Sequence, residues 1–135
     1  MEGEMFAGHS HSPDDILAAL YLYAGPAHFT SDKEVIHSTL SNLFGKYAKQ
    51  FSELKELFTF CSGESYPFSK EVEGVLMRLQ ISSVIIAENP AYNKYMINRD
   101  IRNEIIFELE ENLSQPEVDL LKNMSKEFAE VCKVD

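Results

Sequence analysis

The chain has 135 residues, 44% of them hydrophobic and 25% charged, and its formal net charge is −10 at pH 7. The apolar fraction excludes a disordered chain, because such chains lack the apolar surface that offsets chain entropy. The acidic character disfavours nucleic acid as a partner, since a polyanion is bound by clustered Lys and Arg and repelled by a negative field. No apolar run approaches the roughly 20 residues of a membrane span, and the acidic start of the chain is unlike a signal peptide. We expect a cytoplasmic protein without membrane contact.

The length predicts one domain, residues 12–135, preceded by a flexible N-terminus, residues 1–11. The two cysteines, Cys61 and Cys132, lie far apart and outside any Cys-x-x-Cys spacing. Neither a zinc site nor a redox dithiol is therefore indicated. Both cysteines are expected to be reduced and partly buried.

The first helix is predicted to begin at Ser12, whose side chain can cap free amides, with Pro13 at the first helical position and two carboxylates behind it. Gly25 and Pro26 end it. Apolar residues recur between these signals at helical spacing, so one stripe should face the core. These residues are Ile16, Leu17, Leu20, Tyr21 and Ala24.

A capping box at Ser31–Glu34 opens a longer amphipathic pattern that runs to Phe58. Gly45 should bend or divide this pattern, because glycine in a helix interior costs about 1 kcal/mol relative to alanine. One long kinked helix and two shorter helices are both compatible with it. Residues 59–67 mix apolar residues with turn formers and predict a loop, with a short edge strand at most.

Ser69 should cap a third helix, in which Val72, Val75, Leu76 and Leu79 share one face. Two β-branched or aromatic runs follow, 84–86 and 95–97, and Asn89-Pro90 suits a type I turn between them. A helix followed by a hairpin is expected here. Beyond Asn98, two apolar periodic segments predict C-terminal helices within residues 100–132, the second opened by a capping box at Ser114–Glu117.

The segment from Tyr66 to Leu79, with the two strand runs after it, resembles the third helix and the wing of winged helix-turn-helix proteins. The resemblance covers residues 66–98. It implies a mainly α (α+β) fold: about five helices and one β-hairpin, arranged as a winged-helix-like core with a C-terminal helical extension. In DNA-binding members of that superfamily, the helix before the hairpin enters the major groove and the wing touches the backbone. Here Lys70 and Arg78 share the exposed sides of that helix with Glu71 and Glu73, which suits an interaction or dimerisation module better.

The lack of catalytic motifs in the sequence favours a protein that is not an enzyme. The sequence has no glycine-rich phosphate loop, nucleophile elbow or His-Glu-x-x-His pair, and no cofactor or metal is predicted. The His9-Ser10-His11 spacing can hold a metal, but it is also simply a terminus with two histidines. His28 is expected in a solvated turn, and His37 at the boundary of the core. Glu104 and Glu108 share a helix face, most simply as a solvated acidic face.

Three functions follow from these observations. The first is a non-catalytic regulatory or adaptor-type interaction module, a homodimer whose closing helices supply the interface through Ile105, Leu109, Leu121 and Phe128. The second is a DNA-binding transcriptional regulator with a local basic surface that includes Lys70, Arg78 and Lys94. The third is a small-molecule sensor or small enzyme with a pocket lined by Tyr and Phe.

Overall fold

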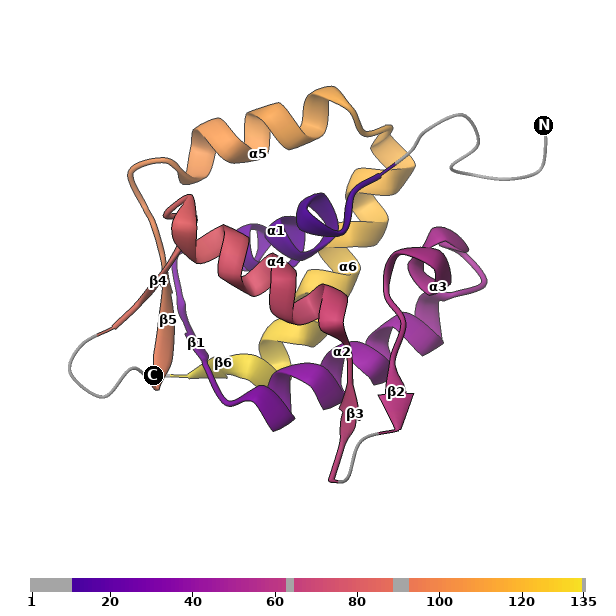
Figure 1. The fold of residues 1–135 in the computed structure, drawn as a ribbon. Coiled ribbons are helices and arrows are strands. Elements are labelled where there is room, and N and C mark those ends of the chain that lie inside the picture. Colours follow the sequence, from indigo (N-terminus) through magenta and orange to yellow (C-terminus); the bar gives the residue numbers. More distant parts are fainter. Residues whose placement is uncertain (1–10, 63–64, 89–92, 135) are drawn as a thin grey trace.

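The computed structural model of the chain describes residues 11–62, 65–88 and 93–134. Helices dominate this part (Figure 1). They are α1 (Pro13–Tyr23), α2 (Lys33–Tyr47), α3 (Glu53–Leu57), α4 (Lys70–Ile81), α5 (Arg102–Glu111) and α6 (Gln115–Cys132). The strands are β1 (His28–Thr30), β2 (Cys61–Ser62), β3 (Pro67–Phe68), β4 (Ile85–Ala87), β5 (Lys94–Ile97) and β6 (Lys133–Val134). The expected mainly helical fold with a small antiparallel component is confirmed in this coarse form.

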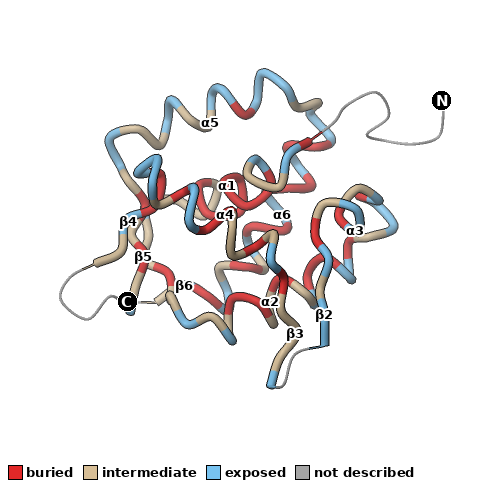
Figure 2. Tube along the Cα trace, in the orientation of Figure 1, coloured by how far each residue is buried: buried red, intermediate tan, exposed pale blue. Residues whose placement is uncertain are grey.

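Helix α1 is the centre of the core. It begins as predicted, with the Ser12 hydroxyl accepting a hydrogen bond from the Asp15 amide at 3.1 Å. Every residue from 16 to 22 is buried, so the prediction of a single buried stripe was wrong (Figure 2). This segment has no polar residue to face solvent, and a helix that is apolar on all sides is stable only when neighbours surround it. Helices α4, α5 and α6 all pack against α1.

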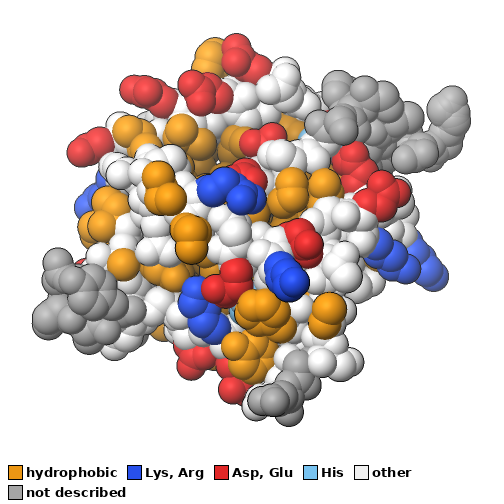
Figure 3. All heavy atoms as spheres, in the orientation of Figure 1, with side chains coloured by type: hydrophobic (Ala, Val, Ile, Leu, Met, Phe, Trp, Pro, Cys, Tyr) orange, Lys and Arg blue, Asp and Glu red, His pale blue; other side chains and the backbone are white. Residues whose placement is uncertain are grey.

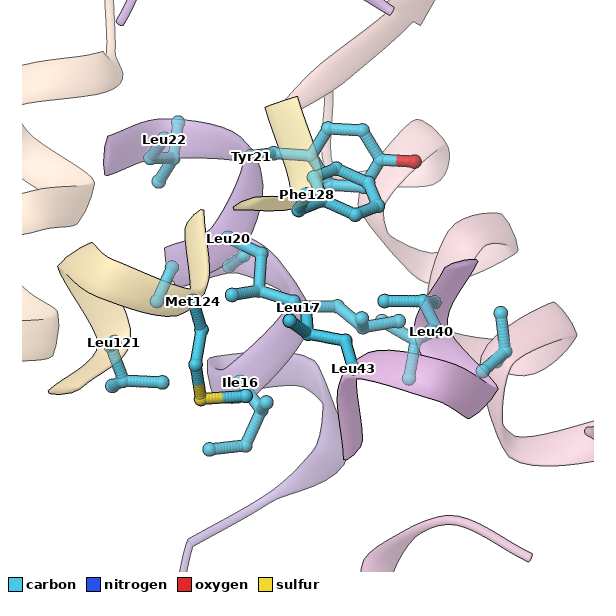
Figure 4. Close-up of a cluster of buried hydrophobic side chains, with 14 of the residues drawn as sticks. Ile16, Leu17, Leu20, Tyr21, Leu22, Leu40, Leu43, Leu121, Met124 and Phe128 are labelled. Atoms are coloured by element: carbon cyan, nitrogen blue, oxygen red, sulfur yellow. The ribbon is translucent and has the colours of Figure 1, made fainter. Parts of the chain in front are cut away.

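Side chains of α1, α2 and α6 meet in one apolar cluster (Figure 4). Leu17 of α1 points toward Leu40 of α2, and Met124 of α6 approaches the same cluster. Phe128 of α6 packs edge-on against Tyr21, with the ring centroids 5.0 Å apart. The two C-terminal helices that the sequence predicts are present, and the predicted capping box at Ser114 and Glu117 forms.

The break in the second amphipathic pattern lies after Tyr47, not at Gly45. Gly45 lies inside α2 and is exposed. The chain turns where the carbonyl of Tyr47 accepts hydrogen bonds from the amides of Gln50 and Phe51, and Phe51 becomes fully buried. A glycine inside a helix costs only about 1 kcal/mol. Burying the Phe51 ring contributes more than this, so the position of Phe51 decides where the helix ends.

The main sheet has the strand order β4-β5-β1-β6, with antiparallel pairing throughout. The predicted hairpin is its β4–β5 pair, in which Ile86 faces Met96; the predicted turn at Asn89-Pro90 lies outside the described residues. A second hairpin, β2–β3, occupies the segment predicted as a loop, so the expectation of one hairpin was wrong. Strands of two or three residues are too short to show the alternation by which strands are recognised.

Helix α4 ends in a Schellman motif, the paired hydrogen bonds that commonly close a helix. The amide of Val84 donates to the carbonyl of Leu79 at 2.9 Å, and the amide of Ser83 donates to the carbonyl of Gln80 at 3.0 Å. Ser83 adopts a positive φ of 64°, a conformation that favours glycine. The reversal at Ser83 directs the chain from α4 into β4, and so positions the hairpin beside this helix.

Candidate functional site

Two large apolar side chains are exposed in the second half of α4. Met77 and Ile81 are 63% and 77% exposed, and residues four apart on a helix share one face. Ile86 on β4 is also exposed. Hydrophobic side chains gather over α4 and β4 on the side shown in Figure 3. The apolar periodicity of α4 marks its buried stripe and leaves out Met77 and Ile81. A helical projection places these two residues together, opposite that stripe.

The basic residues of the DNA-binding alternative have different surroundings. Lys70 is the exposed first residue of α4. Arg78 is engaged by Asp14 of α1, with Nε to Oδ2 at 2.8 Å and Nη2 to Oδ1 at 2.9 Å. Lys94 lies on β5, opposite Thr30 of β1, and is half-buried. The Arg78 guanidinium is therefore already paired with the Asp14 carboxylate, and this pairing raises the pKa of Arg78.

The four residues expected at a dimer interface lie mostly in the core. Leu109 is 8% exposed, Leu121 is 1% exposed and Phe128 is fully buried. Ile105 is half-buried and packs against the edge of the core. The apolar periodicity of these four residues marks the faces of α5 and α6 that point into the core. Their side chains pack against other residues of their own chain. Phe107 on α5 and Val131 on α6 are the exposed large apolar residues of these two helices.

His37 is fully buried, whereas the sequence placed it at the core boundary. Its Nδ1 accepts a hydrogen bond from the Ser69 amide at 3.1 Å, so its Nε2 carries the proton and donates to Glu73 at 2.7 Å. Burial raises the pKa of Glu73, but the hydrogen bonds from His37 and Lys33 outweigh it and leave this pKa lowered. The imidazole also stacks on Phe68, with ring centroids 4.7 Å apart.

The Ser69 hydroxyl, which lies beside His37, stabilises the start of α4. Ser69 Oγ accepts from the Val72 amide, which caps α4, and donates to Glu71. Glu71 in turn accepts from the Thr59 amide, and these contacts lower its pKa. His37 therefore joins α2 to the start of α4 and to β3.

His11 begins the described chain and is buried, although the sequence assigned it to the flexible N-terminus. Its Nδ1 lies 2.8 Å from Glu53 of α3, and its Nε2 lies 3.2 Å from Glu117 of α6. His9, the other half of the possible metal pair, lies outside the described residues. Within the described ranges, no group of three or more His, Cys, Asp or Glu side chains is placed to hold a metal ion.

The remaining predicted residues are dispersed. His28 lies on β1, partly exposed, 3.4 Å from Glu88. Cys61 is exposed on β2, and Cys132 is buried at the end of α6, where desolvation raises its pKa to about 11. Among the described residues, both thiols are free of disulfide bonds. A thiol whose pKa lies far above neutrality is a poor nucleophile.

Two neighbouring cavities lie beside α5, one between α1, α4 and α5 and the other between α1, α5 and α6. One has a volume of about 440 Å³ and the other about 310 Å³, and both are lined by Asp15, Leu109 and Asn112. The aromatic residues at the centre of the fold instead pack on each other, as in the trio of Tyr21, Phe29 and Phe128. The cavities were not predictable from periodicity, because they depend on how far α5 stands from α1.

No family model, curated protein or solved structure matches this chain. Among the described residues, none of the helices combines the length and the apolar character needed to cross a bilayer. The surfaces and cavities of this fold are therefore the features from which a function can be inferred.

Proposed function

We propose that the chain is a non-catalytic interaction module on a winged-helix-like scaffold, and that it forms a homodimer through the exposed face of α4 and β4. The observation that carries this proposal is the exposure of Met77 and Ile81, one turn apart on α4. Such a pair offers two adjacent apolar side chains to a second helix. Exposed apolar residues grouped in this way are typical of interaction surfaces.

The order of the elements supports the winged-helix-like scaffold. Helix α1, strand β1, helix α2, helix α4 and the β4–β5 hairpin follow one another, and β1 pairs with β5 at the open side of the hairpin. This order resembles that of a winged-helix unit and supports the proposed scaffold. Helix α3 and the β2–β3 hairpin are inserted between α2 and α4.

Two features favour a protein partner over DNA on this scaffold. A helix-turn-helix reads DNA with two helices joined by a turn of a few residues, whereas residues 48–69 separate α2 from α4 here. A DNA-reading helix also presents basic and polar groups to phosphates and base edges. The exposed side of α4 presents Met77 and Ile81, while Arg78 is held by Asp14.

The proposed dimer is symmetric, since an exposed helix face can pack against its own copy about a twofold axis. Each copy carries a formal charge of −10, so two copies repel each other at long range. An interface centred on apolar side chains avoids adding to that repulsion. A stable interface buries roughly 800 Å² on each partner, and the contact must therefore extend from α4 over β4, where Ile86 is exposed.

Sedimentation equilibrium over a wide concentration series tests this function. We expect a mass that rises from the 15.4 kDa monomer toward the dimer, and an association that strengthens with added salt because salt screens like charges. DNA binding has the opposite salt dependence, so a parallel titration with a generic duplex separates the two functions. A duplex bound at low salt and released at high salt supports the DNA-binding alternative and contradicts ours.

Matched variants localise the interface. Ile81→Glu on α4 should remain monomeric, because it places a charge at the centre of the proposed contact. Phe107→Glu is the control, since Phe107 is 66% exposed on α5 and outside the proposed interface. Both sites are exposed, so neither variant should unfold the chain. A wild-type protein that stays monomeric throughout, or an equal loss of dimer in both variants, refutes the proposal.

A further inference from the structure

The two cavities beside α5 form one groove. They share Asp15 of α1, Leu109 of α5 and Asn112 directly after α5, and they extend along α5 in opposite directions. One end reaches Arg78 and Ser82 at the end of α4, and the other reaches Leu113 and Leu121. We name this space the α5 groove. The volume of its larger part, about 440 Å³, lies within the roughly 300–1,000 Å³ of ordinary ligand sites.

The position of α5 creates the groove. Arg102 at the start of α5 donates from Nε to the carbonyl of Leu22 at 2.9 Å, and Tyr23 donates to Glu110 at 2.8 Å. These bonds hold α5 to the end of α1. Leu109 is buried, but Ile105 is only partly covered, and the neighbouring space between the helices stays open.

The base of the groove is aliphatic. Leu79 and Val84 come from the end of α4 and the segment after it, and Ala18 contributes the small side chain of α1 that leaves room for the cavity. Ile105 and Leu109 line the α5 side. Apolar side chains of a ligand would gain about 25 cal/mol for each Å² of surface that they bury here.

The rim of the groove is negatively charged. Asp14 and Arg78 neutralise each other in their bidentate pair. Asp15 of α1 and Glu108 of α5 also line the groove and are exposed, and within the described part of the chain neither carboxylate has an ion pair with another residue. The excess charge at the rim is therefore negative, and its complement is a cation.

We infer that the α5 groove binds a peptide segment that combines basic and aliphatic side chains, with its cations on Asp15 and Glu108 and its aliphatic groups on the base. Two neighbouring cavities that share Asp15, Leu109 and Asn112 can take several side chains of one extended chain, which favours a peptide over a compact small molecule. Residues 1–10 of this chain are poorly matched to the groove, because they contain two glutamates and no Lys or Arg. This site lies beyond the proposed dimer, since it uses Arg78 and Leu79 of α4 and leaves Met77 and Ile81 free.

Fluorescence anisotropy with three labelled peptides of equal length tests the inference. The first alternates Leu and Lys, the second Leu and Glu, and the third Ala and Lys. We expect only the first to bind firmly, with an affinity that falls as salt is added. Binding of the Leu–Glu peptide, equal binding of the Ala–Lys peptide, or no binding of the Leu–Lys peptide at any concentration overturns the inference.

Charge-matched variants separate the groove from the general acidity of the protein. The double variant Asp15→Asn/Glu108→Gln should lower the affinity for the Leu–Lys peptide about five- to tenfold, because it removes two exposed charge partners. Glu34→Gln/Glu130→Gln removes the same charge from exposed positions on α2 and α6 and should leave the affinity within about twofold. An equal loss in the two variants shows non-specific attraction and overturns the site.

A free amine supplies the last comparison. Spermidine carries positive charge without aliphatic side groups, and we expect it to displace the Leu–Lys peptide only at concentrations far above that of the peptide. Displacement at comparable concentration would mean a small-cation site and would overturn the peptide assignment. All of these peptide-binding measurements can also be made on the Ile81→Glu protein, which lacks the proposed dimer contact. Groove binding and dimerisation can therefore fail independently.

Discussion

Arg78 of α4 reaches across to Asp14 of α1 and holds its carboxylate through two hydrogen bonds of 2.8 and 2.9 Å. Gly74, one turn earlier in α4, lies directly beside the Arg78 guanidinium. A Cβ built at Gly74 would lie 3.1 Å from Arg78 Nη1, which is tighter than an ordinary contact. The arrangement joins the first and fourth helices at the surface, at the rim of the α5 groove.

Gly74→Ala should therefore stabilise the protein by less than the helix propensity of alanine alone would give. That propensity is worth about 1 kcal/mol, but the new methyl group displaces the guanidinium from its place beside Asp14. In the Arg78→Ala background the displacement is absent, and the full gain of about 1 kcal/mol should appear. Urea unfolding of the four proteins measures the coupling. Additive effects of the two substitutions would contradict this account.

Ser83→Gly should stabilise the protein by about 0.5–1 kcal/mol. The residue has a φ of 64°, and this left-handed conformation costs an L-residue other than glycine about 1 kcal/mol. The Schellman hydrogen bonds are made by backbone atoms and stay intact. Ser82→Gly is the control: Ser82 has ordinary helical dihedrals, and glycine there should destabilise. Thermal unfolding distinguishes the two, and a loss of stability in Ser83→Gly would refute the assignment of strain.

His37→Ala should cost about 3 kcal/mol of unfolding free energy. It leaves the buried Ser69 amide without an acceptor and opens a cavity between α2 and β3. His28→Ala, at a partly exposed site, should change stability by less than about 0.5 kcal/mol. Denaturant unfolding at neutral pH gives both values. A small effect at His37 would mean that α4 is capped without the imidazole.

Tyr47 should make stability depend on alkaline pH. Its hydroxyl donates to Glu127 of α6, and this hydrogen bond, with burial, raises the pKa of Tyr47 to about 12. A raised tyrosine pKa stabilises the fold below the unfolded value of about 10. That contribution is lost as pH rises through about 12. The difference in unfolding free energy between wild type and Tyr47→Phe should therefore be constant up to about pH 10 and shrink above it.

The Glu127→Gln background supplies the control for this titration. Without the carboxylate, Tyr47→Phe should have a smaller effect, and the alkaline decline of the difference should be smaller and end at a lower pH, because the main cause of the raised Tyr47 pKa is gone. Urea unfolding at a series of pH values measures all four proteins. A difference that stays constant across the alkaline range would show that the hydrogen bond does not stabilise the fold.

Local chemistry made three of the helix starts predictable, whereas α2 is capped by Asp32 and not by the predicted Ser31. Ser12, Ser69 and Ser114 cap helices as expected, because a capping hydroxyl needs only the amides of the next turn. The break near Gly45 was misplaced, since the packing of Phe51 decides it. Strands β1 and β6 were missed because partners distant in sequence hold them in place.

The candidate surfaces were less predictable than the fold. Apolar periodicity marked Leu121 and Phe128 correctly as one face of α6, but it cannot say whether such a face meets another chain or the same chain. Arg78 was identified as a cation, while its partner Asp14 lies 64 residues earlier. The α5 groove depends on the spacing of α1, α4, α5 and α6, and no single segment of the sequence contains it.

The central position of α1 has a consequence for synthesis of the chain. The carbonyl of Leu20 in α1 accepts a hydrogen bond from Ser125 of α6, 105 residues later, and α6 covers much of the apolar surface of α1. A growing chain exposes this helix before the segment that covers it exists. Contacts this distant in sequence also slow folding, because a long loop must close first. Ribosome-bound chains that end before Gln115 should therefore be the aggregation-prone species, and a chaperone that shields apolar helices should act most strongly on them.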